Sequence, residues 1–300
     1  MNDRVAWVGI GRMGAAMVER LLADGVEVAV WNRSPEKADP LVELGATRLE
    51  RLQDAGALDV VVTTIADDAA LAALHAPGGL LDGEHRPRVW IDCSTVSIGA
   101  ASAAAAAAAE RGVAYVVAPV SGNPVVVRAG TAIFAISGDD AAALDTAEAL
   151  VSRIGRAVYR VGDGTAASAV KLCTNALLSV IVQSLAEVVV LGEALGVRRA
   201  ALMEFMNDSA VGSPLTRYKT GNMVELQFPP TFTAQGQRKD IRLALAEASA
   251  QELPMPVLSA TEVEYSRLVA SGLGEGKDYA ALVLQVARDA GMVLEPEVLA

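Results

Sequence analysis

Near the N-terminus, Gly9-Ile10-Gly11-Arg12-Met13-Gly14 carries three glycines at the spacing G-x-G-x-x-G. The motif follows an apolar run at 5–9 that is typical of a strand. It precedes a helical pattern at 15–24, which ends at Gly25, and a second strand is predicted at 26–31. A strand, a glycine turn, a helix and a second strand form a βαβ unit, whose strands lie parallel.

The alternation of strands and helices continues through the first half of the chain. This order predicts a doubly wound α/β domain with a parallel sheet. After Gly164 the pattern changes to helices joined by short loops, so we expect two domains, at 1–164 and 165–300. Further helices are predicted near 35–45, near 67–75, and at 97–110 and 139–152, and further strands at 59–65, 88–92, 113–118, 131–137 and 156–161.

Composition excludes several classes of function. The chain has 25 lysines and arginines against 36 aspartates and glutamates, and its net charge of -11 repels nucleic-acid phosphates and anionic membrane surfaces. Two cysteines make neither a disulfide framework nor a zinc site, and no other metal motif is present. The first four residues show no signal-peptide pattern, and polar residues interrupt every apolar run before the roughly 18 residues of a membrane span. We expect a cytoplasmic protein without a nucleic-acid, membrane or metal partner.

One long helical pattern without proline runs from Ala166 to Leu195 and is apolar around most of its circumference between 176 and 191. A helix of this kind must be covered on nearly all sides, and the second domain alone is too small to do so. The sequence therefore predicts a homodimer built on this helix, and leaves open whether dimers pair into tetramers. Cys173, on the same helix, is expected in the core.

The glycine motif predicts a dinucleotide site. Backbone N–H groups at the start of the helix can receive a pyrophosphate, and glycines let the backbone approach it closely. An NAD site usually carries an acidic residue at the end of the second strand, where this chain has Asn32-Arg33-Ser34. The guanidinium and the hydroxyl suit a 2′-phosphate, so NADP(H) is favoured over NAD(H). The residues assigned to the cofactor here are Gly9, Ile10, Gly11, Arg12, Met13, Gly14, Asn32, Arg33 and Ser34.

Several further segments follow these motifs in a definite order. In order and spacing they resemble the β-hydroxyacid dehydrogenase family, which includes 3-hydroxyisobutyrate dehydrogenase, tartronate semialdehyde reductase, glyoxylate and succinic semialdehyde reductases and, more distantly, 6-phosphogluconate dehydrogenase and the imine reductases. The resemblance spans nearly the whole chain and implies a Rossmann N-terminal domain followed by an all-α C-terminal domain. The segments are Asp92-Cys93-Ser94-Thr95, Ala118-Pro119-Val120-Ser121-Gly122, Gly130-Thr131, Lys171-Leu172-Cys173-Thr174-Asn175 and Lys239-Asp240.

Lys171 is the expected acid–base residue. It lies on the apolar long helix, and desolvation brings the pKa of a lysine closer to neutrality. The resemblance implies the same role, as base toward a hydroxyl in oxidation and as acid toward a carbonyl oxygen in reduction. Asn175 lies four residues on, on the same helix face, and can orient the substrate or Lys171. The structural alternatives are a lysine that extends to solvent and an amide that only packs in the core.

The resemblance also implies a substrate site. Ser121 and Gly122 match the segment that binds the substrate carboxylate. The family usually has Asp and a second Gly where this chain has Val117 and Asn123. The asparagine side chain adds a hydrogen-bond donor but narrows the space in which the backbone could approach the ligand, so the identity of the substrate stays open.

Two further matches concern the cofactor. Thr95 matches a residue near the nicotinamide ribose, with an ordinary helix cap as its alternative, and Lys239 matches a lysine that reaches the cofactor and active site from the second domain, with an exposed charge cluster as its alternative. Thr64, Ile65 and Ala66 follow another predicted strand end, so we expect them to line the cofactor crevice.

Together these features predict an NADP(H)-dependent oxidoreductase that interconverts a small β-hydroxy acid and its semialdehyde. One alternative is an imine reductase or reductive aminase on the same fold, although such relatives commonly carry Asp or Tyr at the position of Lys171. A cationic lysine also disfavours an iminium substrate. A second alternative is a non-catalytic NADP-binding sensor or scaffold. Lys171, Asn175 and Lys239 argue against it, because cofactor binding alone needs no proton donor.

Overall fold

The computed structural model describes residues 4–299. Residues 1–3, on which the expected absence of a signal peptide partly rests, and residue 300 lie outside the described residues. The chain divides into two compact units, Met1–Leu172 and Cys173–Ala300. The division falls inside the long helix α7 (Ala166–Ala194) rather than before it. The reason is that Ala167, in the first turn of α7, is buried in a core of the first unit.

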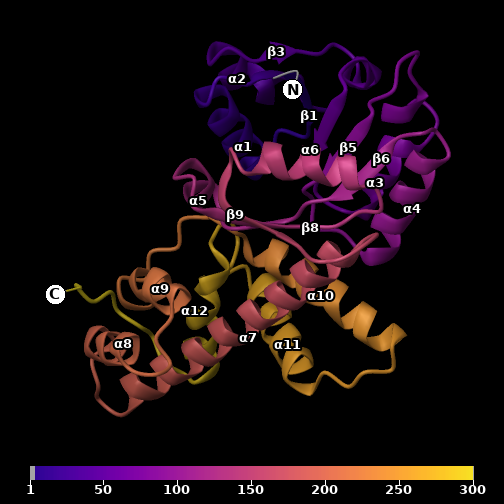
Figure 1. Cartoon of the computed structure of the whole chain (residues 1–300). Helices are drawn as coiled ribbons and strands as arrows, with labels where there is room; N and C mark the ends of the chain where they lie inside the picture. The colour runs from indigo at the N-terminus through magenta and orange to yellow at the C-terminus, as the bar shows by residue number, and fades with distance from the viewer. Residues whose placement is uncertain (1–3, 300) are drawn as a thin grey trace. The chain divides into compact units, whose positions relative to one another are not determined.

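The first unit contains a six-stranded parallel sheet in the order β3-β2-β1-β4-β5-β6. Figure 1 labels β1, β3, β5 and β6 of this sheet. The chain builds the sheet outward from β1 in one direction and then, from β4, in the other. In sheets of this kind ligands bind at the carboxyl ends of the strands beside this reversal. The strands are β1 (Arg4–Val8), β2 (Glu27–Trp31), β3 (Thr47–Arg48), β4 (Val60–Thr63), β5 (Val89–Asp92) and β6 (Ala114–Val117).

Both faces of this sheet are covered by helices. Alternate residues of β1 enter different cores: Val5 and Trp7 pack with α1 and α6, whereas Ala6 and Val8 pack with α3 and α4. This alternation follows from the two-residue period of a strand. Because helices cover both faces of the sheet, most residues of β1, β2, β4, β5 and β6 are apolar. The helices of the unit are α1 (Arg12–Ala23), α2 (Asp39–Glu43), α3 (Asp68–His75), α4 (Ile98–Ala109), α5 (Pro124–Arg128) and α6 (Ala141–Val151).

A second sheet of three strands was not predicted. It consists of β7 (Val120–Ser121), β8 (Ala132–Ile136) and β9 (Gly155–Arg160), with β7 antiparallel and β9 parallel to β8. The prediction that the strands at 131–137 and 156–161 belong to the parallel sheet is wrong. Pro119 follows β6 and has no N–H for a sheet ladder, so the chain leaves the first sheet there and turns back. As a result, β7 ends at Ser121, within the predicted carboxylate segment.

Among its described residues, the second unit consists of helices joined by loops, with one isolated β-bridge between Thr233 and Asp278. Its core gathers around large buried side chains such as Met203, Ile241, Tyr265 and Leu282. Helix α7 is by length and composition long and apolar enough to cross a membrane, because its most apolar 18-residue window has a mean hydropathy of 1.8. The prediction that polar residues leave no run of this length apolar enough for a membrane span is therefore wrong. Within the fold, 56% of this window is buried. The other helices are α8 (Arg199–Asp208), α9 (Pro214–Val224), α10 (Ala234–Ala250), α11 (Pro256–Ala270) and α12 (Leu282–Asp289).

One stripe of α7 is apolar and exposed. Leu177, Val188, Leu191 and Leu195 are exposed by 61%, 41%, 57% and 71%. Cys173 lies one turn before Leu177 and is exposed as well. The prediction that Cys173 lies in the core is therefore wrong, because the stripe that the fold leaves uncovered includes its position.

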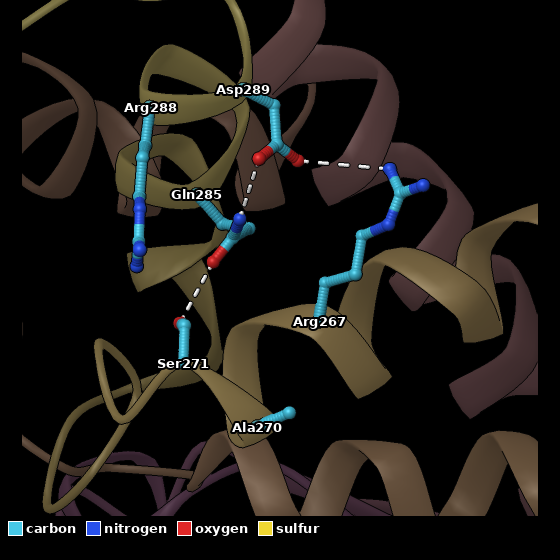
Figure 2. A pocket seen from close by; sticks show the side chains of 6 residues that line it. All are labelled: Arg267, Ala270, Ser271, Gln285, Arg288 and Asp289. Carbon is cyan, nitrogen blue, oxygen red and sulfur yellow. Dashed lines mark hydrogen bonds and ion pairs between the residues drawn. The ribbon is translucent and has the colours of Figure 1, made fainter.

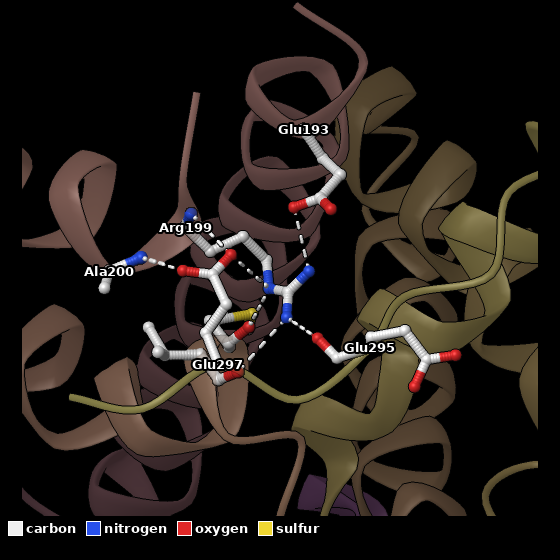
Figure 3. A network of polar contacts seen from close by, with 7 residues as sticks. Glu193, Arg199, Ala200, Glu295 and Glu297 are labelled. Atoms are coloured by element: carbon white, nitrogen blue, oxygen red, sulfur yellow. Dashed lines mark hydrogen bonds and ion pairs between the residues drawn. The ribbon is translucent and has the colours of Figure 1, made fainter. Parts of the chain in front are cut away.

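The C-terminal segment is fixed to the second unit by Arg199, whose side chain is completely buried (Figure 3). Its guanidinium pairs with Glu193 at 2.8 Å and also donates to the backbone oxygen of Glu295 and to those of Met223 and Val224. The carboxylate of Glu297 accepts the first N–H groups of α8, from Arg199 at 2.9 Å and Ala200 at 3.1 Å. A buried guanidinium with this many acceptors is stable without solvent, so the network anchors the end of the chain.

Candidate active site

The three glycines of the turn after β1 have different roles. A Cβ on Gly9 would lie 2.2 Å from the Thr64 carbonyl oxygen, and Gly9 has a φ of +98°. A Cβ on Gly14 would lie 2.2 Å from the Gly9 carbonyl oxygen and 2.4 Å from Thr64 Oγ1. Gly11 is exposed, and a Cβ there would meet no described atom within 4 Å. Two glycines thus allow tight packing, and the middle one leaves the backbone open to a ligand.

Helix α1 begins directly after Gly11, which makes no side-chain cap. Its first turn, Arg12 to Gly14 onward, carries no acidic residue. Because the first N–H groups of a helix have no partner within the helix, this end can donate to an anion. The glycine turn therefore fits the pyrophosphate of a dinucleotide.

Asn32 connects the end of β2 to the glycine turn. Its side-chain oxygen accepts the Ile10 N–H at 2.8 Å, and its amide nitrogen donates to the Ser34 oxygen at 2.8 Å. The amide group of Asn32 is thus used to position both neighbouring segments. Arg33 is exposed beside them and Ser34 is half-buried, so these two side chains are the candidates for contact with a ribose phosphate.

Two consecutive threonines join the strand ends through opposite faces of the sheet. Thr64 Oγ1 accepts the Trp7 indole N–H at 2.9 Å and donates to the Gly9 oxygen at 2.6 Å. Thr63 Oγ1 accepts the Trp90 indole N–H at 3.0 Å and donates to Asp92 at 2.7 Å. Ile65 and Ala66 continue this strand end. The predicted cofactor segments after β1, β4 and β5 are therefore held in one hydrogen-bonded frame.

Asp92 is the centre of this frame on the β5 side, and sequence reasoning gave it no role. The residue is 1% exposed. Oδ1 accepts the Ser94 hydroxyl at 2.6 Å and the Ser94 N–H at 3.1 Å, and Oδ2 accepts the Tyr115 hydroxyl at 2.9 Å. Ser94 Oγ in turn accepts the Ile65 N–H at 2.9 Å, and Thr95 follows, half-buried. The available signal was the polar run Asp-Cys-Ser-Thr directly after an apolar strand.

The neighbours of Asp92 respond to burial and to its charge. Burial, and then the negative charge of Asp92, raise the pKa of the Cys93 thiol and that of the Tyr115 phenol well above their usual values. Both groups are therefore neutral at physiological pH. Cys93 is inert by this criterion, and Tyr115 is a fixed hydrogen-bond donor.

Lys171 lies beside the predicted carboxylate segment although 50 residues separate them in sequence. Its Nζ donates to the Val120 oxygen at 2.8 Å, directly before Ser121. Gly122 has a φ of +153°, and a Cβ there would come within 3.0 Å of Val126 Cγ1. Asn123 caps α5 by accepting the N–H groups of Val125 at 2.9 Å and Val126 at 3.1 Å. The first unit thus places the Lys171 side chain against the backbone that leads directly into Ser121 and the exposed Gly122.

Asn175 lies one turn beyond Lys171 on α7 and is buried in the second unit. Its side-chain nitrogen donates to Asp240 at 2.5 Å, and its backbone oxygen accepts from Gln237, a residue that sequence reasoning missed, at 3.0 Å. Asp240 is ion-paired with Lys239 at 3.1 Å. Asn175, Asp240 and Lys239 therefore form one polar chain that fixes the amide.

A pocket of about 660 Å³ opens elsewhere in the second unit (Figure 2). None of the predicted site residues lines it. Its polar side chains bond to one another: Ser271 donates to Gln285 at 2.8 Å, Gln285 to Asp289 at 2.9 Å, and Asp289 lies 3.7 Å from Arg267. These groups need no ligand to be satisfied. Among the described residues, no group of three or more His, Cys, Asp or Glu side chains is arranged to hold a metal ion.

Two family models match the chain. Residues 4–162 match the NAD binding domain of 6-phosphogluconate dehydrogenase, and residues 165–286 match the NAD-binding domain of NADP-dependent 3-hydroxyisobutyrate dehydrogenase. Both matches agree with the fold, in which a parallel sheet with a glycine turn precedes a helical region.

Individual relatives agree with these models. The chain is 35% identical to an NAD-dependent L-serine dehydrogenase of Pseudomonas aeruginosa, over 85% of this chain and 89% of that protein. It is 27% identical to the chloroplastic glyoxylate/succinic semialdehyde reductase 2 of Arabidopsis thaliana, over 93% of this chain and 78% of that protein. The solved structure of 3-hydroxyisobutyrate dehydrogenase from Mycobacterium tuberculosis with L-serine is similar at a TM-score of 0.83 and 25% identity, covering 95% of this chain and 99% of that one. The chain belongs to the β-hydroxyacid dehydrogenase family of NAD(P)-dependent dehydrogenases and reductases.

Proposed function

We propose that this chain interconverts a small β-hydroxy acid and its semialdehyde with NADP(H) as cofactor. The observation that carries the proposal is the contact of Lys171 with the Val120 oxygen at 2.8 Å. It sets a proton donor beside Ser121 and Gly122, which would bind the substrate carboxylate together with Asn123. A carboxylate held next to an ammonium group orients the reacting carbon and oxygen of a short substrate.

When bound, NADP(H) supplies the hydride in reduction and accepts it in oxidation. In reduction the Lys171 ammonium donates a proton to the carbonyl oxygen as that oxygen gains negative charge. In oxidation the neutral amine takes the hydroxyl proton. Asn175, fixed by Asp240, orients the substrate or Lys171 in this scheme.

The proposed cofactor residues fall into groups along the strand ends. The glycine turn would bind the pyrophosphate, and Arg33 and Ser34 the 2′-phosphate. Thr64, Ile65, Ala66 and Thr95 would line the nicotinamide half, and Lys239 is proposed as a further contact. The chain has no acidic residue at Asn32-Arg33-Ser34 to bind a free 2′-hydroxyl, which supports NADP(H).

Replacing Arg33 by alanine is expected to raise the Kd of NADPH by about 10- to 100-fold, the worth of a charge-assisted contact to phosphate. The Kd of NADH, which lacks that phosphate, should change less than about twofold on the same reasoning. Fluorescence titration with both cofactors measures the difference. Arg88→Ala is the matched control, because Arg88 is exposed and directly precedes β5, at the amino ends of the strands and not at their carboxyl ends. Equal losses of both affinities would contradict the assignment to the 2′-phosphate.

Carboxylate recognition is tested by a substrate pair that differs only in that group. The kcat/KM for succinic semialdehyde should exceed that for butanal by about 100-fold or more, because butanal has no carboxylate and leaves the hydrogen-bond donors of the site without a partner. An enzyme indifferent to the carboxylate would refute this part of the proposal. Reduction of a neutral cyclic imine would favour the imine reductase alternative, and tight NADPH binding without turnover would favour the sensor or scaffold.

We also infer a homodimer from the exposed stripe on α7, defined by Leu177, Val188, Leu191 and Leu195. Four exposed aliphatic side chains in one line are an unfavourable surface for a monomer. Sedimentation velocity should give a dimer, or a tetramer made of two dimers, for the wild type and a monomer for Leu191→Asp. Val211→Asp, at an exposed valine outside the stripe, should leave the assembly intact. A monomeric wild type would contradict this inference. The two unpaired thiols fit the cytoplasmic location that we propose.

A further inference from the structure

We propose that the buried carboxylate of Asp92 biases the cofactor site toward the oxidised nicotinamide, so that NADP⁺ is held more tightly relative to NADPH. The inference rests on the proposed function only in requiring that the chain bind both forms of the cofactor. It concerns a residue that touches neither substrate nor proton donor in the scheme above and that acts through its charge.

The directions of the hydrogen bonds indicate a carboxylate ion. The Trp90 indole can only donate to Thr63 Oγ1, at 3.0 Å, so the hydroxyl hydrogen of Thr63 is directed to Asp92. In the same way, the Ile65 N–H donates to Ser94 Oγ at 2.9 Å, which directs the Ser94 hydrogen to Asp92. With the Ser94 N–H, Oδ1 therefore receives three donors, and the Tyr115 hydroxyl supplies one to Oδ2. All four donors direct a hydrogen to the carboxyl group, which therefore only accepts, as a carboxylate does.

This negative charge has no cationic partner among residues 4–299: no lysine, arginine or histidine there forms an ion pair with Asp92. The aspartate is also 1% exposed, so water screens it poorly. A charge in such surroundings acts over a longer distance than one at the surface. Its field therefore reaches the ligand side of the strand end.

The sheet order indicates which part of a dinucleotide this field meets. The glycine turn follows β1, and Arg33 follows β2 on one side of the reversal in strand order. A pyrophosphate at the turn and an adenosine phosphate at Arg33 leave the β4 and β5 side for the nicotinamide half. Asp92 is the last residue of β5. The nicotinamide ring carries one positive charge when oxidised and none when reduced, so Asp92 attracts only the oxidised ring.

The decisive variant is Asp92→Asn, because it removes the charge and keeps the shape. The asparagine oxygen can retain the three donors now on Oδ1, and its amide can donate to the Tyr115 hydroxyl oxygen. Isothermal titration of the free protein gives the Kd of each cofactor form without turnover. The ratio of the NADP⁺ Kd to the NADPH Kd should rise about five- to twentyfold in the variant.

Two control variants separate charge from structure. Tyr115→Phe removes one donor but keeps the carboxylate and the edge-to-face contact with Trp90, whose ring centroid lies 5.0 Å away. Asp59→Asn removes an exposed carboxylate that directly precedes β4, at the amino ends of the strands, whereas Asp92 lies at their carboxyl ends. Neither should change the Kd ratio by more than about twofold, since neither removes the buried charge.

An unchanged ratio in Asp92→Asn, or equal weakening of both forms, would overturn the inference and leave Asp92 a structural residue. If Asp92→Asn does not fold, the neutral Asp92→Ser variant is measured in the same way, because serine can still accept the Ser94 N–H and leaves room for a water molecule. A wild type that binds neither form contradicts the proposed function itself. A wild type that binds both forms, with an unchanged ratio in the variant, contradicts only the role of Asp92.

Discussion

Replacing Lys171 by alanine is expected to lower kcat/KM for a carboxylated aldehyde by about 10²- to 10⁴-fold, the usual worth of a positioned general acid. The Kd of NADPH should change less than about twofold on the same account, because Lys171 is assigned to proton transfer and not to the cofactor. Steady-state NADPH oxidation and fluorescence titration of the same preparations measure the two quantities. A loss confined to cofactor affinity would contradict the assignment.

Two further variants show whether the proton or only the positive charge matters. Lys171→Arg keeps the charge, but a guanidinium does not release its proton near neutral pH, so this variant should be nearly as slow as Lys171→Ala. Lys277→Ala is the matched control, since Lys277 Nζ also donates to a backbone oxygen, that of Leu273 at 2.9 Å. It should keep full activity. An active Lys171→Arg enzyme would mean that the site needs a cation and not an acid.

Alanine at Gly14 should destabilise the fold, whereas alanine at Gly11 should leave its stability unchanged. The Gly14→Ala methyl would meet the Gly9 oxygen and Thr64 Oγ1 at 2.2 and 2.4 Å. The Gly9 backbone cannot yield easily, because its N–H donates to the Trp31 oxygen at 2.9 Å. We expect Gly14→Ala to lose about 2–4 kcal/mol in the free energy of unfolding and to bind no cofactor.

The Gly11→Ala methyl has no described atom within 4 Å, and Gly11 has an ordinary φ of -83°. Its free energy of unfolding should therefore stay within about 0.5 kcal/mol of wild type. The methyl does, however, occupy the surface that a pyrophosphate would approach, so the Kd of NADPH should rise about tenfold or more. Urea denaturation and fluorescence titration test both glycines together. A Gly11→Ala protein that binds NADPH normally would refute the proposed position of the pyrophosphate.

Elements with a clear period could be predicted from sequence, and short ones could not. The strand at 5–9 and the long helix at 166–195 appear at nearly the expected bounds, as β1 and α7. The two-residue strand β7 is too short to show a period, so the second sheet was missed. Helix α5 was missed too, although Asn123-Pro124 is a usual start for a helix, with the asparagine as its cap.

Pairs of side chains brought together by the fold were harder to predict. Lys171 could be selected from its motif and its apolar helix, but its contact with the Val120 oxygen depends on the unpredicted second sheet. The bonds of Asp92 to Thr63 and Tyr115 join three strands, so no local pattern contains them. Cys173 was assigned to the wrong helix face because apolarity on nearly all sides of α7 hides which face is covered.

The most direct test of the account is turnover by the wild type, with NADPH and NADH, of a panel that holds glyoxylate, succinic, tartronic and methylmalonic semialdehydes and a cyclic imine. The account predicts faster NADPH oxidation with at least one carboxylated aldehyde than with the imine, and a hydroxy acid as the product. Turnover of the imine alone, or tight NADPH binding with no turnover of any compound, would contradict it.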